Sequence, residues 1–112
     1  MTDGAFSFTV EQEGPPQTHT ILRLAGEIDM MTAPELRACL VQHLTMHPQH
    51  FTLDFNRVGF FGSAGIAVLV EVKRAAQEQG SKLYVVNTGA SVMRTLATTG
   101  LAELFCDEPP PP

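Results

Sequence analysis

Short stretches that alternate between apolar and polar residues predict the first strands of this chain. Phe6–Val10 alternates strictly, and His19–Ala25 alternates again around a group of aliphatic residues. Between them, Glu13–Gln17 contains two prolines, which cannot donate hydrogen bonds to a sheet, so this segment predicts a loop. Two strands joined by a short loop predict an antiparallel hairpin.

A helical pattern follows the hairpin. Thr32 is a natural N-cap, and Glu35, three residues later, completes a capping-box pattern. The helix should end near Met46, because Pro48 disfavours helical backbone at the residue before it. The apolar stripe of this helix, spaced at four residues, consists of Leu36, Leu40 and Leu44.

Two further pairs of strand and helix follow. His50–Phe55 predicts a buried strand, and after a short connection the segment from Ser63 to about Gln79 predicts a helix. Gly80 is placed to end that helix in the left-handed conformation. Lys82–Asn87 predicts the last strand, and residues 91 to about 99 predict the last helix. The residues of that helix expected to face inward are Val92, Met93 and Leu96.

The order β-β-α-β-α-β-α predicts an α/β fold. We expect a mixed, mostly parallel sheet of four to five strands with one antiparallel edge, and helices packed on it. A chain of 112 residues is long enough for one domain, which we assign to residues 1–106. Residues 107–112 form a proline-rich tail that we expect to be disordered.

Composition disfavours several classes of function. The net charge is -5 and Lys plus Arg number only 7, so the chain gains little from binding nucleic acid or an anionic membrane surface. It contains no apolar run of about 20 residues and no secretion signal. Cys39 and Cys106 lie far apart, and we expect both to be reduced. We therefore expect a cytoplasmic protein that binds neither nucleic acid nor membranes.

Motifs for catalysis, cofactors and metals are weak or missing. A serine hydrolase needs glycine two residues before and after its nucleophile, and around Ser63 Gly65 fits but Phe61 does not. No phosphate-binding or dinucleotide-binding loop is present. Cys39, His43 and His47 recur every four residues, but three such ligands span about 12 Å along a helix, too far for one ion. We expect no catalytic residue, no cofactor and no metal site.

Three carboxylates lie near predicted strand ends: Glu27, Asp29 and Asp54. Any acid–base pair would have to come from them, although capping turns is the simpler role. Asp29 stands out, because parallel strands would bring its strand end close to Ser63. Sites in open α/β sheets gather at the carboxyl ends of the strands.

Ser63 lies where a predicted strand gives way to a helix, between Gly62 and Gly65. A serine there can cap the helix. It can also be a phosphorylation site, since a phosphate adds about -1.5 to -2 charges, which a helix N-terminus tolerates. If a partner docked on the neighbouring small and aliphatic residues, that charge would break the complex without unfolding the domain. The residues alone leave both roles open.

Several motifs together resemble the STAS domain and, within it, the small bacterial anti-sigma factor antagonists. They are Gly26-Glu27-Ile28-Asp29, Thr32-Ala33-Pro34-Glu35-Leu36, Asp54-Phe55 and the run from Phe61 to Leu69. The resemblance covers about residues 6–106 and implies the STAS fold. It implies a partner switch, in which the antagonist binds an anti-sigma factor that is also a serine kinase and so releases a sigma factor. Phosphorylation of the family serine, Ser63 here, separates the pair, and a PP2C-type phosphatase reverses it.

The resemblance implies a binding protein rather than an enzyme. Where the family usually has Asp-Ser-Ser/Thr-Gly, this chain has Gly62-Ser63-Ala64-Gly65, so a carboxylate and a second hydroxyl are missing. The alternative is a STAS module that binds a protein or a small ligand without phosphorylation. In either case, the residues expected to contact the partner are Asp29, Gly62, Ser63, Ala64, Gly65, Ile66 and Ala67.

Overall fold

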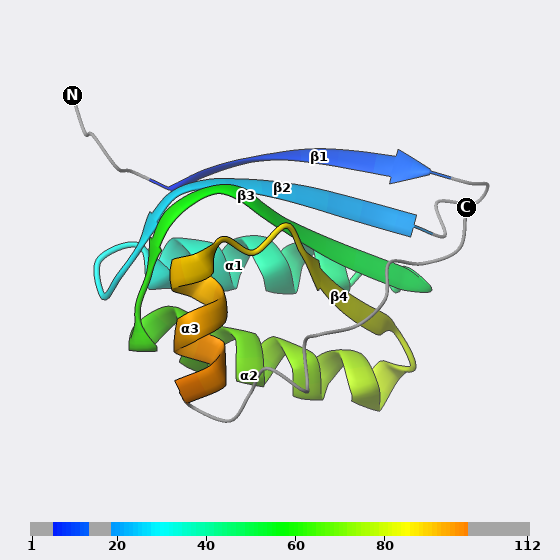
Figure 1. The fold of residues 1–112 in the computed structure, drawn as a ribbon. Coiled ribbons are helices and arrows are strands. Elements are labelled where there is room, and N and C mark those ends of the chain that lie inside the picture. Colours follow the sequence, from blue (N-terminus) through cyan, green and yellow to red (C-terminus); the bar gives the residue numbers. More distant parts are fainter. Residues whose placement is uncertain (1–5, 14–18, 99–112) are drawn as a thin grey trace.

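The computed structural model describes residues 6–13 and 19–98, which form one sheet and its helices (Figure 1). The predicted order of elements is confirmed over these residues. The strands are β1 (Ser7–Glu13), β2 (His19–Ile28), β3 (His50–Phe61) and β4 (Lys82–Val86), and the helices are α1 (Ala33–Leu44), α2 (Ser63–Gln79) and α3 (Ala90–Thr98).

The sheet has the strand order β1-β2-β3-β4 in the described part of the chain. β1 pairs antiparallel with β2, whereas β2, β3 and β4 run parallel. The predicted hairpin and the predicted mostly parallel sheet with one antiparallel edge are therefore confirmed. Because β2 and β3 are parallel and end together at Ile28 and Phe61, their carboxyl ends form one edge of the molecule.

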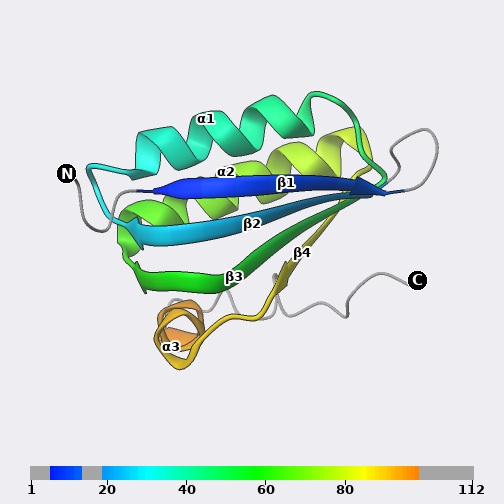
Figure 2. The same ribbon diagram turned by 90° about the horizontal axis from the view of Figure 1, so that it is seen from above.

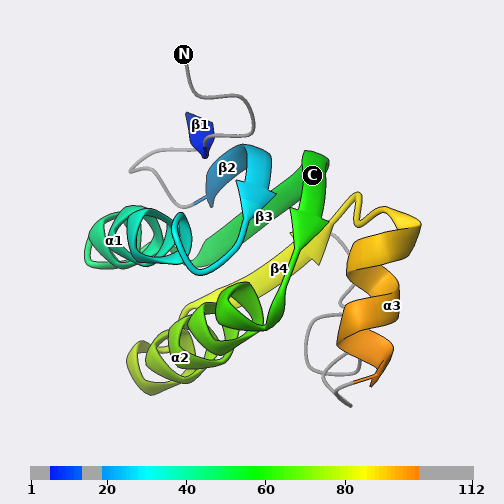
Figure 3. The same cartoon turned by 90° about the vertical axis from the view of Figure 1, so that its left-hand side faces the viewer.

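The helices lie on both sides of the sheet. α1 and α2 lie side by side on one face, and α3 lies on the other face against β3 (Figures 2 and 3). The core between the sheet and the helices contains the predicted leucine stripe of α1, which is buried. None of the helices in residues 6–13 and 19–98 is both long and apolar enough to cross a bilayer.

β3 is longer than predicted. The segment after Phe55 was expected to be a connection, but β3 continues to Phe61, and only Gly62 separates it from α2. Pairing with β2 persists through two register shifts, the first between the pairs Arg23–Asp54 and Ala25–Arg57. Each shift breaks the simple alternation of inward and outward side chains, which is why the sequence pattern concealed this part of the strand.

The first helix differs from its prediction at both ends. Thr32 is the N-cap of α1, but its side chain makes no capping hydrogen bond to the helix, so the predicted capping box is wrong. The helix ends at Leu44 rather than near Met46, and His47, before Pro48, has a positive φ of 55°.

Later elements match more closely. α2 ends at Gly80 with φ 84°, the predicted left-handed conformation. Val92 and Leu96 are buried as predicted, but Met93 is 36% exposed, which corrects its predicted inward position. Glu13 belongs to β1 rather than to the loop. The rest of that loop, Cys106, the predicted end of the last helix and the tail 107–112 lie outside the described residues.

Candidate functional site

The loop that follows β2 lies beside the first turn of α2. The backbone N–H of Gly62 donates a hydrogen bond to the carbonyl oxygen of Ile28 over 2.9 Å. This bond extends the parallel pairing of β2 and β3 by one step, so it brings Asp29 next to Ser63. The structure thus places together the two regions that the sequence singled out.

Ser63 is exposed at the start of α2. The N-cap of the helix is Gly62, which corrects the capping role considered for Ser63. The N–H groups of Gly65 and Ile66 donate to the carbonyl oxygen of Gly62 over 3.0 and 3.1 Å, whereas the Ser63 hydroxyl has no hydrogen-bond partner among the described residues. The hydroxyl is therefore free to contact or react with another molecule.

The electrostatic environment of Ser63 favours negative charge. The first N–H groups of a helix, here those of Ser63 and Ala64, have no partner within the helix. The first turn of α2 contains no acidic side chain that would offset the positive end of the helix dipole. A phosphate on Ser63 would meet these N–H groups without repulsion from the helix itself.

Two of the residues expected to contact a partner lie below the surface. Gly65 and Ile66 are buried, because the first turn of α2 presses against the ends of β2 and β3. The exposed part of this segment is Ser63 and Ala67, flanked by the half-buried Gly62 and Ala64.

Asp29 shapes the loop between β2 and α1. Its carboxylate oxygen Oδ1 accepts hydrogen bonds from the N–H groups of Met31 and Thr32 over 2.9 and 3.1 Å. The Thr32 hydroxyl donates to the carbonyl oxygen of Glu27 over 2.7 Å and accepts from the N–H of Asp29 over 2.9 Å. This network fixes the loop, so the role of Asp29 that the structure displays is to position its neighbours.

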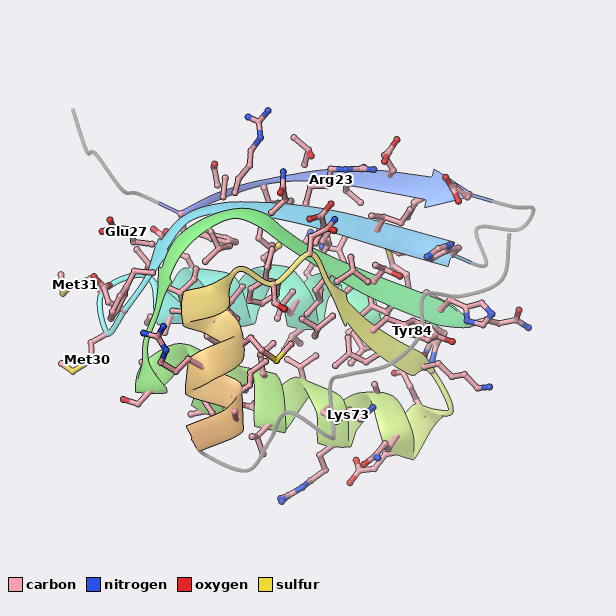
Figure 4. The ribbon with its side chains drawn as sticks, viewed as in Figure 1. Arg23, Glu27, Met30, Met31, Lys73 and Tyr84 are labelled. Atoms are coloured by element: carbon pink, nitrogen blue, oxygen red, sulfur yellow. The ribbon has the colours of Figure 1, made fainter. Side chains whose placement is uncertain are left out.

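The loop presents two methionines that sequence reasoning missed. Met30 and Met31 are 80% and 83% exposed at its tip (Figure 4). Phe60 is 51% exposed, and its ring lies 3.1 Å from the place where a Cβ atom on Gly62 would stand. The sequence did contain a signal for these methionines, since they are two adjacent apolar residues between a predicted strand and a predicted helix, outside the leucine stripe. We call the exposed residues Met30, Met31, Phe60, Ser63 and Ala67 the contact surface.

The other candidate residues lie elsewhere. Asp54 lies well before the end of β3, where its Oδ1 accepts from the N–H of Asn56 over 2.9 Å. Cys39 is buried, and burial raises the pKa of its thiol to about 11. The Nδ1 atom of His43 is hydrogen-bonded to the carbonyl oxygen of Cys39 over 2.8 Å. In the described part of the chain, no group of three or more His, Cys, Asp or Glu residues is arranged to hold a metal ion.

Comparison with known proteins gives a consistent family. A family model described as STAS domain matches residues 9–110. The chain is 24% identical over 99 residues to the anti-sigma-B factor antagonist of Listeria monocytogenes, covering 88% of this chain and 87% of that protein. It is 29% identical over 85 residues to the anti-sigma-F factor antagonist RsfB of Mycobacterium tuberculosis, covering 76% of this chain and 69% of that protein.

A solved structure agrees with this result. The crystal structure of an anti-sigma factor antagonist from Mycobacterium paratuberculosis superposes with a TM-score of 0.81 at 26% identity, covering 93% of this chain and 86% of that one. The likeness extends over nearly the whole of both chains.

Proposed function

This chain belongs to the STAS domain family, and from that membership we propose that it is an anti-sigma factor antagonist. In this role it binds an anti-sigma factor and so frees a sigma factor for RNA polymerase. The relatives with this name in Listeria and Mycobacterium support the proposal. The chain acts by binding in the cytoplasm and not as an enzyme.

The observation that carries the proposal is the exposed apolar contact surface around a free serine hydroxyl. Met30 and Met31 expose large apolar side chains in the loop after β2 (Figure 4), and Phe60 exposes its ring at the end of β3, beside Gly62. Apolar patches of this kind mark sites of protein association, and methionine adapts its shape to a partner. The hydrogen bonds of Asp29 and Thr32 hold the loop in place before binding, which lowers the entropic cost of forming a complex.

Phosphorylation of Ser63 switches this binding off. The partner is itself an ATP-dependent serine kinase. Ser63 Oγ attacks the γ-phosphorus of ATP as the bond to the β-phosphate oxygen breaks, the hydroxyl proton passes to a base of the kinase, and ADP leaves. A PP2C-type phosphatase hydrolyses the phosphate and restores the hydroxyl.

The position of Ser63 explains why a single phosphate would be enough to block partner binding. At the open N-terminus of α2 the dianion is tolerated, so the domain stays folded. Between the apolar side chains of the contact surface and a partner, the same dianion would lose its water without gaining a counter-charge from this chain, which opposes association. The contact residues in the proposal are Asp29, as the organiser of the loop, with Met30, Met31, Phe60, Gly62, Ser63, Ala64 and Ala67.

Charge substitution at Ser63 tests the switch. We expect Ser63→Ala to bind the anti-sigma factor of the native host as the unmodified protein does, and Ser63→Asp to bind at least about tenfold more weakly, which corresponds to about 1.4 kcal/mol. Affinity is measured by titration calorimetry, with thermal melting to verify folding. Gln77→Glu, which adds the same charge on an exposed part of α2, is the matched control. Equal affinity of Ser63→Asp and wild type would reject the switch.

One observation favours a second candidate function, a STAS module that binds its partner without phosphorylation. Gly62 offers no carboxylate beside the acceptor hydroxyl, and the carboxylate of Asp29 is already held by two N–H groups. The intact mass of protein isolated from its native host distinguishes the two functions. A species heavier by roughly 80 Da, with the phosphate on Ser63, supports the switch. Only unmodified protein, together with retained partner binding, supports the constitutive module.

A further inference from the structure

The sheet has a hollow on the face away from α1 and α2. α3 lies against β3 on this side, and none of the described helices covers the part of the sheet toward β1 (Figure 3). The hollow has a volume of about 560 Å³ and is lined by residues of β1, β2 and β3. We call it the open-face hollow. It lies apart from Ser63 and Met30, and neither of these residues lines it.

The register of the strands explains the shape of the hollow. Ser7, Ala25 and Arg57 form one row across the sheet, and the small side chain of Ala25 lies in the middle of that row. β3 contains one residue more than β2 between the pairs Arg23–Asp54 and Ala25–Arg57. Such a bulge redirects the side chains that follow it, and bulges are common beside binding sites. Arg57 consequently lies on this face, at the side of the hollow opposite Ser7.

The next row contains charges that already have partners. Arg23, on β2 (labelled in Figure 4), forms ion pairs with Glu11 and, over 3.7 Å, with Asp54. The other oxygen of the Asp54 carboxylate accepts the N–H of Asn56 over 2.9 Å. Both carboxylates are therefore engaged within the chain.

Arg57 is the cation in the hollow without a direct carboxylate partner. Its side chain is exposed and has no ion-pair or hydrogen-bond partner among residues 6–13 and 19–98. The hydroxyls of Ser7 and Thr9 and the amide of Asn56 line the same space. The hollow thus combines the donors of these polar side chains with one guanidinium, that of Arg57, which no carboxylate of the described residues contacts.

We propose that the open-face hollow binds a small organic molecule that carries an oxyanion, either a carboxylate or a phosphate group. The planar guanidinium of Arg57 matches two oxygens of such a group, which a lysine could not do in the same way. The hydroxyls of Ser7 and Thr9 hydrogen-bond the remainder of the molecule. A volume of about 560 Å³ lies within the usual range for small-molecule sites. The proposal does not depend on the antagonist function.

Nuclear magnetic resonance with two simple probes tests the site. Acetate and inorganic phosphate are titrated into ¹⁵N-labelled protein at constant ionic strength, with chloride as the reference anion. We expect saturable shifts of the Ser7 and Ala25 amides and of the Arg57 side-chain Nε–H with at least one probe. Shifts that fail to saturate, or that chloride reproduces, would overturn the proposal. Binding of the anti-sigma factor is not needed for this measurement, so its result is independent of the proposed function.

Two variants test the geometry. Arg57→Gln should weaken probe binding at least about tenfold, whereas Arg74→Gln, an exposed arginine on α2, should leave it unchanged. Ala25→Leu should also abolish binding, because it fills the hollow and keeps every charge. Thermal melting verifies that each variant folds. If Ala25→Leu does not fold, the result for Arg57→Gln tests the site by itself. Probe binding retained by Arg57→Gln would reject the site.

Discussion

Gly65 lies so close to Ile28 that a Cβ atom on the glycine would come within 2.7 Å of the isoleucine Cγ2 atom. The same atom would lie 2.8 and 2.9 Å from two ring carbons of Phe61. Ile28 and Phe61 are buried at the ends of β2 and β3. The glycine therefore lets the first turn of α2 rest directly on the sheet, and this contact sets the position of Ser63 at the surface.

Replacing Gly65 by alanine should destabilise the fold. The three contacts below 3.0 Å force Ile28 or Phe61 to move, and overpacking of this kind typically costs about 1–3 kcal/mol. Alanine regains about 1 kcal/mol through its helix propensity, so we expect a net loss of up to about 2 kcal/mol in urea denaturation. Gly59→Ala is the matched control, since its Cβ would meet nothing within 4 Å. A Gly65→Ala variant that is about 1 kcal/mol more stable than wild type, the gain expected without these contacts, would contradict the close contact.

Gly62→Asp should make Ser63 a better kinase substrate. The φ of -97° and ψ of -172° at Gly62 suit any residue, and the nearest obstacle to a side chain is the exposed, movable ring of Phe60. The new carboxylate restores the family's acid beside the hydroxyl and caps α2, which adds a few tenths of a kcal/mol of stability. We expect the cognate kinase to phosphorylate this variant faster than wild type. Mass spectrometry measures the rate at which the phosphorylated species appears.

Gly62→Ala is the matched control for that carboxylate, because it adds the same Cβ atom without the acid. The alanine variant should be phosphorylated no faster than wild type. Equal acceleration by both variants would mean that backbone restriction, and not the acid, limits the reaction.

The sequence predicted the fold better than the site, and particular residues explain why. Val92 and Leu96 were correctly assigned to the core, because the periodicity of a helix is local information. The end of β3 was missed because its pairing with β2 passes through bulges that no local pattern encodes. Ser63 was proposed as a site residue from its motif, but the exposure of Met30 and Phe60 depends on how distant segments meet. Burial of Ile66 was missed for the same reason.

The stability of the fold should fall in mild acid because of His19. Burial lowers the pKa of His19 below its ordinary value of 6.5, Glu13 opposes this effect, and the nearby His50 adds to it. As the pH falls below 6.5, His19 in the unfolded chain therefore binds a proton before His19 in the folded chain does. The contribution of neutral His19 to the free energy of unfolding is complete above pH 6.5, and it is lost as the pH falls from 6.5 to the lowered pKa of the folded state. Urea denaturation at a series of pH values on either side of 6.5 measures this loss.

Substitution of His19 identifies the group responsible. His19→Gln should flatten the pH dependence, since its amide can keep the hydrogen bond that His19 makes with Thr52 over 2.9 Å but does not titrate. His47→Asn, at an exposed position with positive φ, should retain the wild-type dependence. If His19→Gln keeps the full loss of stability in acid, another group is the cause.

The methionines of the contact surface should contribute most of the side-chain binding energy for the partner, so their truncation should weaken binding. Met30→Ala and Met31→Ala together delete two of the most exposed apolar side chains in the described residues, and truncation of central interface residues costs about 2 kcal/mol or more. We expect binding of the anti-sigma factor to weaken at least about tenfold in titration calorimetry. The free energy of unfolding should change by less than about 0.5 kcal/mol, because neither side chain is part of the core.

Met46→Ala removes a methionine that is 55% exposed beyond the far end of α1, and it should leave affinity unchanged. Wild-type affinity in the double variant would place the partner on a different face of the molecule.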